Sequence, residues 1–72
     1  MSIAADDANA WTLLGVARAK ARRFQDALTA LDRAVALAPS AVAPIANRGQ
    51  VRREQGDLPG AAADLERAVA LA

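Results

Sequence analysis

One stretch of this chain occurs twice, and it constrains the fold more than any other feature. Residues 31–38 read LDRAVALA, and thirty-four residues later residues 65–72 read LERAVALA. The only change between the two stretches is the conservative one from Asp32 to Glu66. A fixed period of this length is typical of proteins that stack one supersecondary unit on the next. The sequence therefore predicts a repeat protein.

The repeat divides the chain into a short lead-in and two units. We expect a single domain over residues 1–72, with a lead-in of residues 1–7, repeat one at 8–41 and repeat two at 42–72. Hydrophobic residues make up 54% of the sequence, and alanine dominates them. Alanine is the best helix former but removes little surface from water. This composition predicts an all-α fold with closely packed helices and a thin core.

Composition and charge also exclude several classes of function. The chain has no Cys and no His, which excludes disulfides and leaves no plausible zinc or haem site, so no cofactor is expected. The formal net charge of +1 lacks the basic excess of proteins that bind nucleic acid or an anionic membrane. No apolar run approaches the roughly 20 residues that span a bilayer, and the first residues lack the pattern of a signal peptide. We expect a soluble, cytoplasmic protein.

Apolar residues recur at spacings of three and four, which is the pattern of amphipathic helices. Pro39 should end one helix, and either Ser40 or Ala41 should begin the next, with Ser40 interpreted as a helix cap. The pair Gly56 and Asp57 should separate the last two helices. Residues 6–9, which read DDAN, are suited to start the first helix, because their acidic side chains favour the positive end of its dipole. The pattern predicts four helices near residues 8–21, 24–38, 41–55 and 58–71.

These helices resemble the tetratricopeptide repeat family. The residues that carry the resemblance are Trp11, Leu14, Gly15, Phe24, Ala27, Leu31, Ala34 and Pro39. The resemblance implies two tandem helix-turn-helix hairpins, four antiparallel helices in all, forming the start of a right-handed superhelical solenoid. Arg18 and Arg52 stand where the family usually has an aromatic residue, and Arg48 stands where it has Leu. We expect the stems of these arginines to cover apolar surface.

The same resemblance implies a protein-interaction scaffold that binds a peptide or helix in a concave groove. The candidate groove residues are Asn9, Thr12, Leu13, Val16, Lys20, Ala46, Asn47, Gln50 and Arg53. Lys20 and Arg53 could form a basic edge for a partner with an acidic or C-terminal carboxylate group. The alternative is that these side chains only keep the protein soluble. A chaperone-type carboxylate clamp is not predicted, because Thr12 and Val16 stand where that clamp needs Lys and Asn.

Catalysis is not expected. The Ser and Thr hydroxyls have no His to act as a base, and Asp64 and Glu66 are interpreted as solvated helix positions.

Self-assembly through exposed hairpin ends is the alternative function, because two repeats are fewer than such folds usually need. The candidate residues for self-association are Trp11, Leu65, Val69 and Leu71. A third possibility is that the chain is part of a longer array, because residues 3–7 resemble the end of a preceding repeat.

Overall fold

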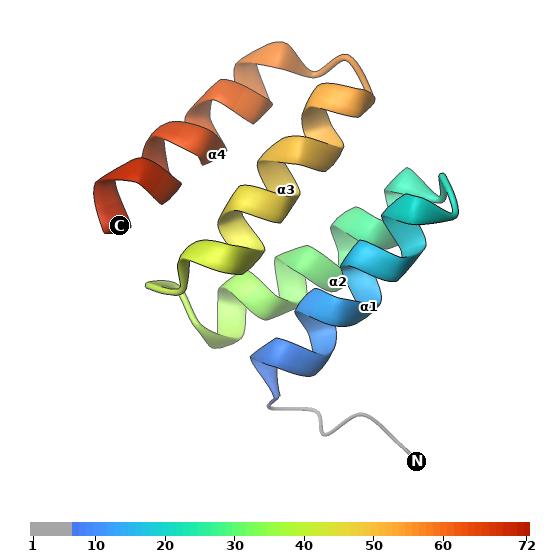
Figure 1. Cartoon of the computed structure of the whole chain (residues 1–72), viewed down its shortest axis with the longest axis horizontal. Coiled ribbons are helices and arrows are strands. Elements are labelled where there is room, and N and C mark those ends of the chain that lie inside the picture. The colour runs from blue at the N-terminus through green and yellow to red at the C-terminus, as the bar shows by residue number, and fades with distance from the viewer. Residues whose placement is uncertain (1–6) are drawn as a thin grey trace.

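The computed structural model describes residues 7–72, which form four helices joined by short turns (Figure 1). The helices are α1 (Ala8–Lys20), α2 (Phe24–Leu37), α3 (Val42–Glu54) and α4 (Leu58–Leu71). Residues 7–72 contain no strand. The predicted all-α fold of two helical hairpins is therefore confirmed. The suggested resemblance of residues 3–7 to a preceding repeat depends on a segment that, apart from Asp7, lies outside the described residues.

Most helix boundaries have a local cause that the sequence indicates. The Asp7 carboxylate accepts a hydrogen bond from the Ala10 N–H at 3.2 Å and caps α1. The Asp57 carboxylate accepts one from the Gly60 N–H at 3.0 Å and caps α4. The prediction for Ser40 is wrong: the N-cap of α3 is Ala41, and no side chain hydrogen-bonds there.

The two turns within the hairpins have the same backbone geometry. Gly56, between α3 and α4, has a φ of 85°, in the left-handed region that glycine adopts without strain. Arg22, between α1 and α2, occupies the equivalent position thirty-four residues earlier and has a φ of 62°. An arginine is strained at this φ, because its Cβ approaches the following carbonyl oxygen.

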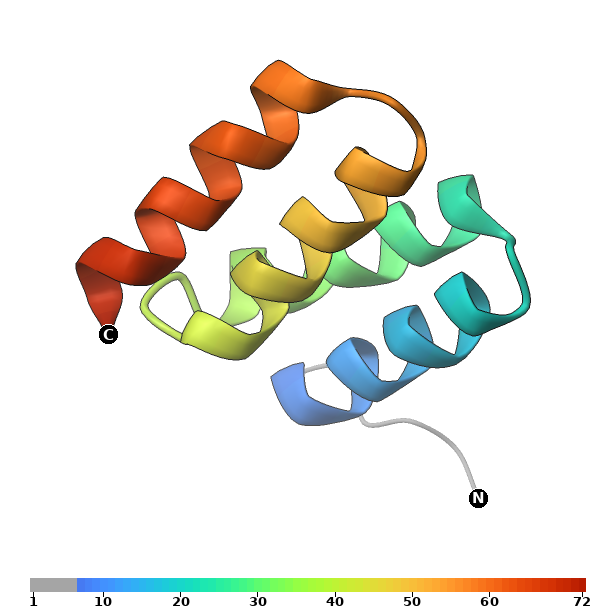
Figure 2. The ribbon, with the colours of Figure 1, turned by 45° about the horizontal axis from the view of Figure 1, so that its top comes forward.

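The two hairpins stack through α2 and α3. Figures 1 and 2 both show α3 between α2 and α4, with α1 and α4 on opposite sides of the molecule. One core cluster joins Ala27 and Leu31 of α2 to Val51 of α3. A second joins Val35, Ile45 and Ala68, from α2, α3 and α4. Each cluster crosses the boundary between the repeats, so the second hairpin is packed onto the first.

Small residues allow α1 and α2 to cross closely. Gly15 is buried, and a Cβ added to it would lie 2.6 Å from Cγ of Leu31 and 3.3 Å from the carbonyl oxygen of Ala27. Carbon atoms do not approach this closely, so an alanine here would force Leu31 to shift from its position.

A cluster of charged side chains around the buried Asp64 fixes α3 against α4. Arg48 donates from Nε and Nη2 to the two carboxylate oxygens of Asp64, at 3.0 and 2.8 Å. Arg52 donates to the same carboxylate at 2.9 Å, and Arg48 also reaches Asp32 of α2 at 3.1 Å. We call these four residues the ion-pair cluster. The interpretation of Asp64 as a solvated position is wrong, because only 4% of the residue is exposed.

No helix within residues 7–72 is long and apolar enough to cross a membrane.

Candidate functional site

A hollow lies between α1 and α3 in the described part of the chain. Its volume is about 160 Å³, and side chains from α1, α2 and α3 line it. The lining residues are Val16, Ala19, Lys20, Leu31, Asn47, Gln50, Val51 and Glu54. Because this surface joins helices of both repeats, it exists only when the hairpins are stacked. We call it the groove.

The floor of the groove is apolar and firmly packed. Leu31 is fully buried and Val51 is 4% exposed, and both belong to the core cluster that joins the repeats. Val16 and Ala19 are half-buried on the α1 side. An apolar side chain of a ligand would therefore contact the accessible parts of Val16 and Ala19, above a core that is already formed in the free protein.

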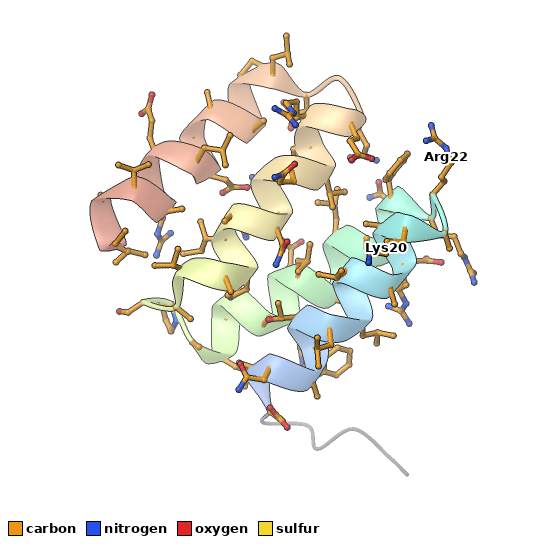
Figure 3. All side chains as sticks on the ribbon, in the orientation of Figure 1. Lys20 and Arg22 are labelled. Atoms are coloured by element: carbon orange, nitrogen blue, oxygen red, sulfur yellow. The ribbon has the colours of Figure 1, made fainter. Side chains whose placement is uncertain are left out.

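Polar groups form the rim. Asn47 and Gln50 lie on α3, and their amides can both donate and accept hydrogen bonds. Lys20 and Glu54 are the last residues of α1 and α3, and neither forms an ion pair with another residue of the range 7–72. Figure 3 shows Lys20 near the end of α1, while Arg22 projects from the following turn away from the molecule. The rim thus offers hydrogen-bonding groups and one free charge of each sign.

The structure places four of the nine predicted groove residues around this hollow, namely Val16, Lys20, Asn47 and Gln50. The other five lie outside it. Asn9 and Leu13 are exposed on α1, and Leu13 is 69% accessible. Arg53 is exposed and donates to the Gln50 side chain at 3.3 Å. It therefore lies beside the rim, although not in the lining.

Two of those five residues serve the packing of the helices. Thr12 is only 9% exposed, and its hydroxyl donates to the Ala8 carbonyl at 2.8 Å. Ala46 is half-buried against the core cluster around Val35 and Ile45.

Sequence reasoning missed Ala19, Leu31, Val51 and Glu54 as groove residues. A signal for Glu54 was available, because it lies seven residues after Asn47 and four after Gln50, on the same face of a helix. Leu31 and Val51 belong to the core cluster between the repeats, and such apolar residues can form the floor of a groove as well as a core.

The ion-pair cluster supports the groove from behind α3. The hydrogen bond that Arg48 donates to Asp64 raises the pKa of its guanidinium above the usual range. The hydrogen bond from Arg48 to Asp32 also raises this pKa. Burial acts in the opposite direction and is outweighed. Arg48 therefore stays charged and joins α3 to both α2 and α4, which holds Asn47 and Gln50 in position.

The residues predicted for self-association lie at the two ends of the stack. Val69, Leu71 and Leu65 on α4 are 76%, 38% and 36% exposed. Trp11 on α1 is half-buried, and the guanidinium of Arg33 lies 5.4 Å from the centre of its ring.

Comparisons with known proteins agree with this architecture. A family model described as "Tetratricopeptide repeat" matches residues 13–72. The chain is 42% identical over 66 residues to "Tetratricopeptide repeat protein 36" of Mus musculus, an alignment that covers 92% of this chain and 36% of that protein. The Homo sapiens protein of the same name is also 42% identical over 66 residues, with 92% and 35% covered. The chain thus spans about a third of the length of these relatives.

Proposed function

Because this chain belongs to the tetratricopeptide repeat family, we propose that it is a non-catalytic interaction module that binds a peptide in the groove between α1 and α3. Proteins of this family are helical-repeat modules for protein–protein interaction and are generally not catalytic. One observation carries the proposal for this chain. The groove combines an apolar floor with a rim of amide and charged side chains, and ligand sites commonly combine an apolar lining with a few polar groups.

The chemistry of the lining indicates how a peptide would be held. A leucine or similar side chain would cover the accessible parts of Val16 and Ala19, while the amides of Asn47 and Gln50 would form hydrogen bonds with the peptide backbone. The amine of Lys20 has no carboxylate partner within residues 7–72, so it is available to an acidic side chain or a C-terminal carboxylate. Glu54 on the same rim opposes that contact, since like charges repel.

A binding assay with a matched pair of variants tests this proposal. The probe is a fluorescein-labelled heptapeptide with a central leucine and a free C-terminal carboxylate, and its amidated form is the comparison. Val16→Arg places a charged side chain over the apolar floor, whereas Leu13→Arg makes the same change on α1 outside the groove. We expect at least a tenfold loss of affinity, about 1.4 kcal/mol, for the first variant and less than a twofold loss for the second. Equal losses, or no saturable binding to the wild type, would overturn the proposal.

The charges on the rim give a second test. Lys20→Gln should weaken the binding of the free-carboxylate peptide more than that of the amidated peptide. Glu54→Gln should strengthen the binding of the free-carboxylate peptide. Both effects should shrink in high salt, because the charges are exposed.

We also propose that the chain associates with itself, through a surface separate from the groove. The specific observation is that Leu58 and Val69 of α4 are 63% and 76% exposed, which leaves apolar side chains in water on the outermost helix.

A further inference from the structure

The turn between α1 and α2 carries the densest group of basic side chains within residues 7–72. Residues 18–23 read RAKARR and contain no acidic residue. The four basic residues are Arg18, Lys20, Arg22 and Arg23. All but Arg18 are exposed, and Figure 3 shows Arg22 projecting from the turn away from the molecule. We call these four residues the basic turn.

The internal repeat shows that the fold does not need these charges. At the equivalent positions of the second hairpin turn, thirty-four residues later, the chain has Arg52, Glu54, Gly56 and Asp57. The formal charge of the four positions is therefore +4 in repeat one and −1 in repeat two. Both turns join a helix of 13 residues to one of 14 residues. The same connection thus forms without a basic turn.

The basic turn is also the less favourable of the two turns for the backbone. In repeat two, Gly56 adopts its φ of 85° without strain, and Asp57 caps α4 through the Gly60 N–H. Repeat one instead places Arg22 at a φ of 62°, and Arg23 is an N-cap without a side-chain hydrogen bond. Two adjacent positions therefore hold an arginine in place of the residue that suits the turn. Departures from local preference are concentrated at functional sites.

The contacts of these two arginines within the chain do not account for them. The guanidinium of Arg22 lies 5.3 Å from the centre of the Phe24 ring. Arg23 forms an ion pair with Asp26 at 2.9 Å, in which the side chains are 68% and 49% exposed. Exposed contacts of both kinds contribute little to stability. The dipole of α1 favours basic residues in its last turn, but Arg23 lies at the positive end of α2, where a cation is unfavourable.

We propose that the basic turn binds a short acidic segment of a partner protein, on a surface separate from the groove. Guanidinium groups match carboxylates, to which they donate paired hydrogen bonds. The segment is short because the remaining described residues, 7–17 and 24–72, carry a formal charge of −2 and repel a longer polyanion such as nucleic acid. Lys20 also lies on the groove rim, so the two surfaces adjoin, whereas Arg22 and Arg23 belong to the basic turn alone.

Fluorescence polarisation with the whole chain tests the choice of partner. The probe is a fluorescein-labelled, amidated peptide with four consecutive glutamates, and the same peptide with four glutamines is the comparison. We expect saturable binding of the glutamate peptide that weakens at least about fivefold between roughly 50 and 300 mM salt, because the charges are exposed. Equal binding of the two peptides, or none of either, would overturn the proposal. Tighter binding of a 20-nucleotide single-stranded DNA than of the glutamate peptide would also overturn it.

Matched variants test the location of the site. Arg22→Gln/Arg23→Gln removes two charges from the basic turn, and Arg33→Gln/Arg67→Gln removes two from exposed positions on α2 and α4. We expect a loss of affinity for the glutamate peptide of at least about fivefold for the first pair and less than about twofold for the second. Equal losses would show that the peptide responds to net charge alone, which would overturn the site.

A variant that copies the turn of repeat two separates binding from folding. Arg22→Gly/Arg23→Asp supplies the residues of Gly56 and Asp57, so it should unfold at a higher temperature than the wild type. Its affinity for the glutamate peptide should nevertheless fall at least about tenfold. Unchanged affinity would overturn the proposal. A lower unfolding temperature would show that the two arginines serve the fold, and it would overturn the proposal as well.

Competition distinguishes this surface from the groove. The amidated heptapeptide with a central leucine should not displace the glutamate peptide, because Arg22 and Arg23 lie outside the groove lining. Displacement would place the acidic peptide in the groove and overturn a separate surface. Binding of the glutamate peptide to a protein that does not bind the heptapeptide would support the basic turn, although the proposed groove function would have failed.

Discussion

Arg48 on α3 and Asp64 on α4 form a bidentate ion pair, and Asp64 is only 4% exposed. Repeat one has Leu14 and Ala30 at the corresponding positions, and Ala30 is fully buried. The equivalent positions of the two hairpins are therefore occupied by different chemistry: an apolar pair in repeat one and a charged pair in repeat two. A buried charge is tolerated only with its partner, so Arg48 and Asp64 depend on one another.

The first prediction concerns this dependence. Asp64→Ala should cost about 3–5 kcal/mol of stability, because it leaves Arg48 and Arg52 without their shared carboxylate. The double variant Arg48→Leu/Asp64→Ala copies the pair of repeat one and should unfold at a higher temperature than Asp64→Ala alone. Thermal unfolding followed by circular dichroism measures both. A double variant less stable than Asp64→Ala would show that the charges are not coupled.

The second prediction concerns the crossing of α1 and α2. Ala27 is fully buried, and its carbonyl lies close to Gly15, so Ala27→Leu should destabilise the fold by about 1–3 kcal/mol. Thr29 is exposed on the same helix, and its hydroxyl only bonds the Gln25 carbonyl at 3.1 Å. Thr29→Leu should change the stability by less than about 0.5 kcal/mol. Equal urea midpoints for the two variants would place Ala27 away from the crossing.

The third prediction concerns the turn between α1 and α2. Arg22→Gly should stabilise the protein by about 0.5–1 kcal/mol. Glycine relieves the backbone strain at a φ of 62°, and this gain is larger than the cost of the greater conformational entropy that glycine gives the unfolded chain. The variant also loses the contact of Arg22 with the ring of Phe24, 5.3 Å away. Arg22→Ala loses the same contact without relieving the strain, so it is the control and should be less stable than Arg22→Gly. The reverse order of urea midpoints would contradict this account.

Much of the fold could be predicted from the sequence because its signals are local. Asp7, Gly56 and Asp57 act within one turn of their own position, so the expected helix ends lie within about one residue of those observed. Ser40 shows the limit of the same reasoning: a residue suited to cap a helix lies one position before the real N-cap, Ala41.

The candidate site was harder to predict because its residues meet across helices. Asp64 lies next to two exposed positions in the sequence, and only the stacking of α3 on α4 reveals that it is buried. The departure of Arg48 from the family pattern was visible, but its partner is sixteen residues away on another helix. The groove floor was missed for a similar reason, since Leu31 and Val51 come from different repeats.

The last prediction concerns the unequal stability of the four helices. The buried residues of α2 are Ala27, Ala30, Leu31, Ala34 and Val35, and the helix packs against both α1 and α3. By contrast, α4 buries Ala61, Asp64 and Ala68 and packs on α3 alone among residues 7–72. Opening α4 therefore exposes less apolar surface than opening α2, and its amides should be protected less in native-state hydrogen exchange.

We expect a difference of at least about tenfold in protection between the centres of α4 and α2, which corresponds to about 1.4 kcal/mol. The measurement belongs at low protein concentration, where copies of the chain do not associate. Val69→Lys should leave the difference unchanged there, because its side chain is already in water. Asp64→Ala should enlarge it, since the ion pair with Arg48 is the strongest polar link between α3 and α4. Equal protection in all four helices would mean that the two hairpins open together, and that stacking on α3 alone suffices to hold α4 as firmly as the centre of the molecule.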